Sequence, residues 1–251
     1  MFINGKWGKA ENSATFDVFN PATGEVIAQV PDGTKKDVCL AIEAADKAFP
    51  AWSSLTAYQR SQYLYTAWKI MIDKKEDLAR IMTMEQGKPL VAARNEVQYG
   101  ADFLLWFAEE AKRVYGQTIP SARPDQRFIV LKQPLGVVGA ITPWNYPVSM
   151  ITRKLAPALA AGCTIVLKPA EATPLCAMEM FKIFEEAKIP AGVVNLVTTL
   201  DPKPVGAQFV SNPIIRKLTF TGSTKVGKLL AKDAAQNMKR ISLELGGHAP
   251  F

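Results

Sequence analysis

The chain has 251 residues, of which 48% are hydrophobic, enough to bury one large core or two smaller ones. Its net charge of +7 comes from 30 basic and 23 acidic residues scattered along the sequence, which favours a solvated surface, or attraction of anionic ligands, over a nucleic-acid interface. No apolar run is long enough to cross a bilayer, and the first residues show no signal-peptide pattern. Three cysteines without paired spacing and a single histidine argue against a disulfide framework and a metal site, so we expect a cytoplasmic protein.

Residues 1–112 are predicted to contain short strands followed by helices. The pair Asn4-Gly5 is typical of a tight hairpin turn. Helical spacing of apolar residues then predicts a helix to about residue 49, capped by Thr34, a region at 56–85 with a break near residue 73, and a helix at 91–112. The last helix carries Phe103, Trp106 and Phe107, which we expect to pack in the core.

Residues 113–135 differ in character from their surroundings. Two prolines and a charged centre separate two alternating segments, which predicts a projecting β-hairpin rather than core sheet. Such an arm can meet another subunit or remain a plain surface hairpin, and the residues by themselves leave both interpretations open.

From residue 136 onward, segments of strand and helix character alternate. Residues 136–141 are apolar, helical spacing begins at Pro147, Gly162 ends that helix, and residues 164–167 have the composition of a buried strand. Continued to residue 243, the order is β-α-β-α-β-α-β-α-β. The sequence therefore predicts an α/β fold with a doubly wound parallel sheet, N-terminal helices and a projecting β-hairpin.

Polar side chains follow the first two strands of this alternation, at the edge where parallel sheets bind ligands. Asn145 comes after the strand at 136–141, and Lys168 and Glu171 come after the strand at 164–167. Lysine as donor and glutamate as acceptor can bind the two hydroxyls of a ribose, although a surface ion pair has the same sequence pattern. We therefore place a binding site at these strand ends.

Two later strand ends carry weaker signals. Residues 220–223 read Phe-Thr-Gly-Ser and lead into a helix, so Gly222 allows a phosphate to approach and Ser223 lies where a helix N-terminus attracts anions. Plain N-capping gives the same pattern, and no Gly-x-Gly-x-x-Gly fingerprint is present. Glu244 follows the last strand and precedes two glycines, a position suited to a general base.

Taken together, four short motifs are far more specific than any one of them. Pro-Trp-Asn at 143–145, Lys-Pro-Ala-Glu at 168–171, Phe-Thr-Gly-Ser at 220–223 and Leu-Glu-Leu-Gly-Gly at 243–247, in this order, resemble the aldehyde dehydrogenase superfamily. The resemblance covers the chain from Phe2 to Phe251, and residues 143–171 are similar to the succinate-semialdehyde dehydrogenase branch. It implies oxidation of a small aldehyde to a carboxylic acid with a nicotinamide cofactor, and a homo-oligomer in the full-length protein.

The resemblance implies a role for each matching residue. Asn145 would stabilise the oxyanion, Glu244 would activate the water that releases the product, and Arg153 would pair with the distal carboxylate of a semialdehyde, with an ordinary helix-surface arginine as the alternative. Lys168 and Glu171 would hold the adenosine ribose. The remaining cofactor contacts would come from Thr142, Pro143, Trp144, Ala170, Gly222, Ser223, Val226, Leu245 and Gly246.

The choice of cofactor follows from the charge beside the ribose. Glu171 would repel a 2′-phosphate and favours NAD, whereas Lys168 would tolerate NADP, so we expect NAD with NADP as the alternative. The resemblance also assigns residues 1–112 and 136–247 to two parts of one cofactor-binding domain and 113–135 to an oligomerisation-type hairpin.

In the family that the motifs resemble, the cysteine nucleophile lies further along the chain than the Leu-Glu-Leu-Gly-Gly motif, at a point after Phe251. The residues around Cys39, Cys163 and Cys176 do not match the motif that surrounds that cysteine. Residues 248–251 are expected to begin a catalytic domain that is absent, and the chain alone is expected to be inactive. A catalytically inactive dinucleotide-binding or interaction protein is the alternative function.

Overall fold

The structure, a computed structural model, describes residues 1–248 of the chain. It confirms the predicted alternation of strands and helices after residue 136. In chain order the elements are β7 (Val137–Ile141), α5 (Ser149–Ala160), β8 (Thr164–Lys168), α6 (Pro174–Glu186), β9 (Val194–Leu196), α7 (Lys203–Ser211), β10 (Ile215–Gly222), α8 (Thr224–Ala235) and β11 (Arg240–Leu245). The expected catalytic-domain start at 248–251 falls, except for His248, outside the described residues.

The main sheet has seven strands in the order β11-β10-β7-β8-β9-β1-β2. Strands β7 to β11 are parallel, and the strand order reverses at β7, from which one half of the sheet runs to β9 and the other to β11. The N-terminal strands β1 (Phe2–Ile3) and β2 (Lys6–Trp7) extend the sheet as an antiparallel edge. Their turn is the predicted one, with Asn4 and Gly5 both at positive φ, 51° and 73°.

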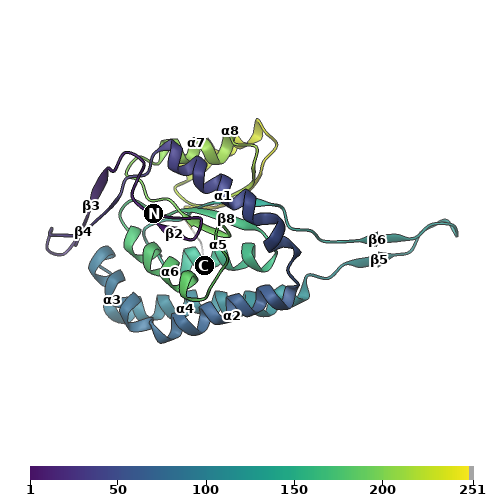
Figure 1. Cartoon of the computed structure of the whole chain (residues 1–251), viewed down its shortest axis with the longest axis horizontal. Helices are drawn as coiled ribbons and strands as arrows, with labels where there is room; N and C mark the ends of the chain where they lie inside the picture. Colours follow the sequence, from purple (N-terminus) through teal and green to yellow (C-terminus); the bar gives the residue numbers. More distant parts are fainter. Residues whose placement is uncertain (249–251) are drawn as a thin grey trace.

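Helices cover both faces of this sheet (Figure 1). Helix α1 (Lys35–Ser54) lies with α7 and α8 on one face, and α2 (Ala57–Asp73), α3 (Lys75–Gln86) and α4 (Leu90–Glu110) lie with α5 and α6 on the other. A short 3-10 turn (Ala111–Arg113) follows α4, and a separate two-stranded sheet is formed by β3 (Thr15–Phe19) and β4 (Val26–Pro31). Within residues 1–248, every helix is too short or too polar to span a membrane.

Two predictions about the N-terminal helices need correction. Helix α1 continues through Pro50 to Ser54, beyond the predicted end at residue 49, because Trp52 is buried and packs the last turn onto the core. The aromatic residues of α4 pack in the core only in part: Phe107 is half-buried against the core, Phe103 is half-buried, and Trp106 is 63% exposed. Helical spacing showed that these residues lie close together on the helix but not which of them another element covers.

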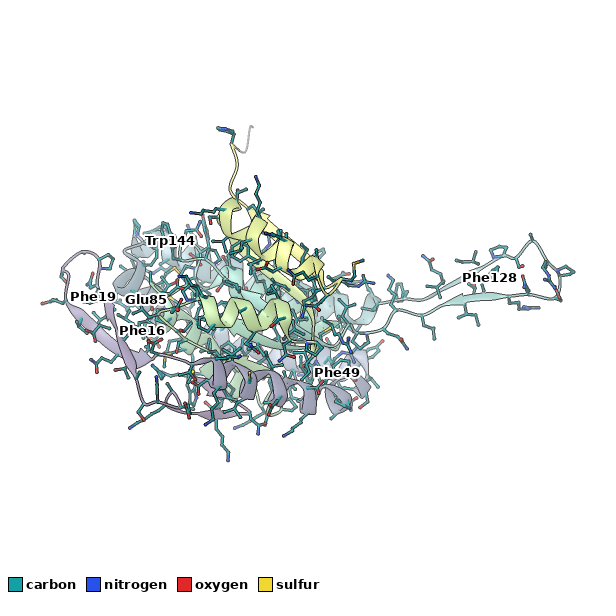
Figure 2. The ribbon with its side chains drawn as sticks, turned by 90° about the horizontal axis from the view of Figure 1, so that it is seen from above. Phe16, Phe19, Phe49, Glu85, Phe128 and Trp144 are labelled. Atoms are coloured by element: carbon teal, nitrogen blue, oxygen red, sulfur yellow. The ribbon has the colours of Figure 1, made fainter. Side chains whose placement is uncertain are left out.

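The predicted projecting hairpin is confirmed. Strands β5 (Gln117–Ile119) and β6 (Phe128–Val130) pair with each other in antiparallel register and extend away from the body of the molecule (Figure 1). All six strand residues are exposed, including Phe128, which lies on the projecting arm at the right of Figure 2. An arm with apolar side chains and unpaired strand edges is a surface that other chains can pair with.

Two buried carboxylates fasten the N-terminal helices to the parallel unit. Glu96 of α4 accepts hydrogen bonds from the amides of Val148 and Ser149, at 3.0 and 3.2 Å, where α5 begins. Glu85 of α3 accepts from the amides of Leu175 and Cys176 at the start of α6. Each carboxylate satisfies amides that have no partner within their own helix and lies at its positive end.

The glutamate beneath α6 makes folding stability depend on pH. Burial raises the pKa of Glu85 from 4.5 to about 7, against the two amide hydrogen bonds, which lower it. The folded chain therefore binds this proton more tightly than the unfolded chain, and the stability from the protonated form is lost as pH rises from 4.5 through 7. We expect Glu85 to account for a decrease of up to about 3 kcal/mol in the free energy of unfolding over that range.

Urea unfolding at pH 5 to 8 measures this decrease. Glu85→Gln removes the titration, so the difference between its unfolding free energy and that of the wild type should change with pH. Glu186→Gln, at an exposed glutamate paired with Lys74, is the control and should give a pH-independent difference. A constant difference for Glu85→Gln would contradict the assignment.

Candidate functional site

The polar residues predicted to form a site follow strands whose ends are aligned in the sheet. Ile141, the last residue of β7, is in register with Lys168 of β8 on one side and with Phe220 of β10 on the other. One position further along, Thr221 of β10 is in register with Glu244 of β11. The candidate site therefore lies along the carboxyl ends of four neighbouring strands, across the point where the strand order reverses.

The loop after β7 carries Asn145. It is joined to β8 by a hydrogen bond from the Thr142 amide to the Lys168 carbonyl, at 3.2 Å. Asn145 is exposed, and its backbone carbonyl accepts a hydrogen bond of 2.8 Å from Nζ of Lys88. Trp144 is 59% exposed and lies, with Glu85, on the part of the body away from Phe128 (Figure 2). The loop thus presents Trp144 and Asn145 to solvent beside the sheet edge, whereas Thr142 is buried.

At the end of β8, Lys168 and Glu171 form an ion pair. The lysine side chain is only 3% exposed, whereas the glutamate is 34% exposed, so the pair opens toward solvent on its acidic side. Burial lowers the pKa of Lys168, and the neighbouring Glu171 carboxylate opposes that shift. Ala170 between them is buried. The predicted donor and acceptor for a ribose therefore lie together in the structure.

The N-terminus of α8 follows the end of β10. Ser223 is its N-cap, and its hydroxyl accepts from the Val226 amide at 3.3 Å, which leaves the amides of Thr224 and Lys225 without a partner inside the helix. A Cβ on Gly222 would lie 2.5 Å from Cζ of Phe220, so this turn needs glycine. The donor set suits the phosphates of a dinucleotide, because free amides and a helix N-terminus both favour an anion.

The end of β11 packs against this helix. The Thr224 hydroxyl donates to the Gly246 carbonyl at 3.1 Å, and a Cβ on Gly227 would lie 2.4 Å from Leu245. Val226 and Leu245 remain 42% and 40% exposed. They are apolar side chains facing solvent at the same edge.

Arg153 and Glu244 come together although they are 91 residues apart in the sequence. A guanidinium nitrogen of Arg153 donates to Oε1 of Glu244 at 3.0 Å, and both side chains are partly exposed. The guanidinium also lies 5.9 Å from the centre of the Phe103 ring. The structure thus joins the two residues to which the resemblance gives substrate and water-activating roles.

Sequence reasoning missed three residues at this site. Lys154, beside Arg153, is buried and donates to the Thr219 hydroxyl at 3.0 Å; burial lowers its pKa to about 8, and Glu244 opposes the shift. Phe103 was expected in the core but lines a hollow of about 300 Å³. Lys88 lines an adjoining cavity of about 600 Å³ with Tyr146. Lys88 stands between Gly87 and Pro89, a pattern that marks a helix boundary in the sequence but indicates no site.

The three cysteines are small packing residues or lie away from the strand ends. Cys163 and Cys176 are buried, and burial raises the pKa of both thiols; Glu85 raises the pKa of Cys176 further. Cys39 is half-buried in α1 and contacts Gln208 at 3.4 Å. Neither buried thiol has the lowered pKa of a reactive thiolate.

The strand order and the helices on both faces together define a doubly wound α/β domain, with the candidate site at its switch point. Residues 7–251 match the model of the aldehyde dehydrogenase family, and the chain belongs to that family. It is 55% identical over 250 residues to glutarate-semialdehyde dehydrogenase of Pseudomonas aeruginosa and 51% identical over 249 residues to the NADP+-dependent succinate-semialdehyde dehydrogenase of Escherichia coli. These matches cover 100% and 99% of the chain but 52% of each relative, so the chain spans about half the length of the curated relatives it matches.

Solved structures agree with this assignment. The structure of succinate-semialdehyde dehydrogenase from Burkholderia pseudomallei superimposes with a TM-score of 0.98 at 50% identity, over 100% of this chain and 52% of that one. A betaine aldehyde dehydrogenase from Staphylococcus aureus in complex with NAD+ gives 0.95 at 38% identity, over 98% of this chain and 50% of that one. Both nicotinamide cofactors therefore occur among the relatives.

Thiol labelling tests whether burial protects Cys163 and Cys176 from reaction. In the native chain we expect a thiol-specific reagent to modify Cys39 alone, because burial protects Cys163 and Cys176 and raises their pKa. Mass spectrometry of labelled peptides identifies the site, and Cys39→Ser should leave the native chain unlabelled while denaturant exposes the other two. Fast native labelling of Cys163 or Cys176 would contradict this assignment.

Proposed function

We propose that this chain is the cofactor-binding half of an NAD(P)-dependent aldehyde dehydrogenase that oxidises a short semialdehyde of a dicarboxylic acid, succinate semialdehyde first among them. The observation that carries the proposal is the alignment of Ile141, Lys168 and Phe220 across the strand-order reversal, which gathers the four motifs at one sheet edge. Residues 1–112 and 136–247 belong to this one domain, which is supported by the pairing of β1 with β9.

The cofactor would lie along the strand ends from β8 to β11. Lys168 and Glu171 would bind the adenosine ribose, and the N-terminus of α8 at Ser223 would receive the pyrophosphate. When bound, the nicotinamide accepts the hydride of the aldehyde. The proposed flanking contacts are Thr142, Pro143, Trp144, Ala170, Gly222, Val226, Leu245 and Gly246.

The substrate would lie between Asn145 and the Arg153–Glu244 pair. The Asn145 side-chain amide would donate to the aldehyde oxygen as charge develops on it, and Glu244 would take a proton from water. Arg153 has donors beyond the one used by Glu244, so it can also hold a carboxylate. Succinate and glutarate semialdehyde, for which the relatives are named, both carry a carboxylate at the end opposite the aldehyde.

Two further properties of the chain are part of the proposal. Aldehyde oxidation of this kind needs a thiolate nucleophile, and the burial of Cys163 and Cys176 supports a chain that binds cofactor without turning over aldehyde by itself. The exposed apolar residues of the β5–β6 hairpin, Phe128 and Ile129 among them, support pairing with a second copy in the complete enzyme.

Calorimetric titration with NAD+ tests the proposed cofactor site. We expect binding by the 251-residue chain, and Lys168→Met should weaken it about tenfold or more by removing a charged hydrogen-bond donor from the ribose. Lys182→Met is the matched control, because Lys182 forms an ion pair with Glu179 at the same sequence spacing on α6 and should leave the affinity unchanged. Absence of binding by a folded wild-type chain would refute the proposed function.

Within the Lys168–Glu171 pair, Glu171 should determine the preference for NAD+ over NADP+. Glu171→Gln removes a negative charge that would face a 2′-phosphate, so the affinity for NADP+ relative to NAD+ should rise about five- to tenfold. Competition between the two cofactors, measured at constant ionic strength, gives this ratio directly. An unchanged ratio would show that Glu171 does not face the 2′ position.

A further inference from the structure

Lys88 occupies an unusual position next to the loop that carries Asn145. Its Nζ donates to the Asn145 carbonyl at 2.8 Å, pairs with the carboxylate of Glu96, and lies 4.1 Å from the centre of the Tyr146 ring. The side chains of Lys88 and Glu96 are 13% and 1% exposed. The ammonium group therefore contacts a carbonyl, a carboxylate and an aromatic face, on a side chain that is largely covered.

The backbone of Lys88 is itself held firmly. Gly87 ends α3 with φ at 79°, a left-handed conformation, and Pro89 is the N-cap of α4. The lysine thus stands on a short connection between two packed helices. Its partner Glu96 lies two turns along α4 and holds the amides of Val148 and Ser149 with its other oxygen. One ion pair therefore touches the loop at Asn145 and at its junction with α5.

We propose that Lys88, together with Glu96, is a positioning residue for Asn145, an inference that rests on the proposed function of Asn145 as a hydrogen-bond donor to the substrate oxygen. A hydrogen bond to the Asn145 carbonyl fixes the peptide plane between Asn145 and Tyr146, and with it the direction of the Asn145 Cα–Cβ bond. The cation–π contact with Tyr146 fixes the next side chain. The exposed side-chain amide of Asn145 is thereby oriented before any substrate binds.

Loss of the ammonium should loosen the loop without unfolding the chain. In Lys88→Met, Oε1 of Glu96 would keep the amides of Val148 and Ser149 at the positive end of α5, whereas Oε2 would lose the ammonium and the chain some stability. Asn145, by contrast, would lose the hydrogen bond that holds its peptide plane. The effect should therefore be confined to the loop at 142–147 and absent from α4 and α5.

Nuclear magnetic resonance relaxation of the 251-residue chain tests this proposal. The side-chain amide of Asn145 and the backbone amide of Tyr146 should be as ordered as the core in the wild type, with order parameters near 0.85, and should fall below about 0.6 in Lys88→Met. Lys88→Arg, which keeps the charge and the donors, should restore the order. Lys74→Met, in the exposed pair with Glu186, is the matched control and should leave Asn145 unaffected.

The outcomes separate positioning from general stabilisation. Unchanged order at Asn145 in Lys88→Met, or loss of order spread evenly over α4 and α5, would overturn the proposal. A measurement on the wild type does not depend on whether a variant folds. The ¹⁵Nζ signal of Lys88 should show slow solvent exchange and a ring-current shift from Tyr146. A fast-exchanging, unshifted signal would also overturn the proposal. NAD+ affinity enters none of these readouts, so failure of the proposed function remains distinguishable.

Discussion

The buried carboxylates that connect α3 and α4 to the parallel unit support the rest of the structure. Glu96 and Glu85 supply acceptors to amides at the starts of α5 and α6, the two helices that follow β7 and β8. Both carboxyl groups lie at the positive end of a helix, where the helix amides act as donors to them. For Glu85, burial outweighs these donors and raises the pKa to about 7. Without these contacts, the N-terminal helices would cover one face of the sheet but would not fix where the loops at its carboxyl edge begin.

The register of the sheet brings the residues of those loops to one edge. Because neighbouring parallel strands end side by side, Lys168, Phe220 and the loop after Ile141 share one edge although up to 79 residues separate their ends in the sequence. The reversal of strand order at β7 brings strand ends from both halves of the sheet together, which is where open parallel sheets bind ligands. Arg153 on α5 and Glu244 on β11 form a direct ion pair.

Short sequence patterns predicted the structure correctly where a residue determines the conformation of the backbone next to it. Thr34 caps α1 as predicted, Asn4 and Gly5 form the predicted tight turn, and α8 begins directly after the Phe-Thr-Gly-Ser segment that was predicted to lead into a helix. Prediction was wrong where the answer depended on what packs from elsewhere. Trp106 belongs to an apolar stripe but is exposed, because helical periodicity shows which residues share a face and not which face is covered.

The sequence by itself determined the α/β alternation, the projecting hairpin and the four motifs that mark the family, since each is encoded within a few consecutive residues. The tertiary structure decided which residues face one another. It added β1 and β2 as an antiparallel edge, paired Arg153 with Glu244 and brought Lys88 to the carbonyl of Asn145. These contacts join residues 57 to 194 positions apart, from Lys88 with Asn145 to Phe2 with Leu196. Their specificity comes from packing, burial and sheet register, which no local pattern of residues expresses.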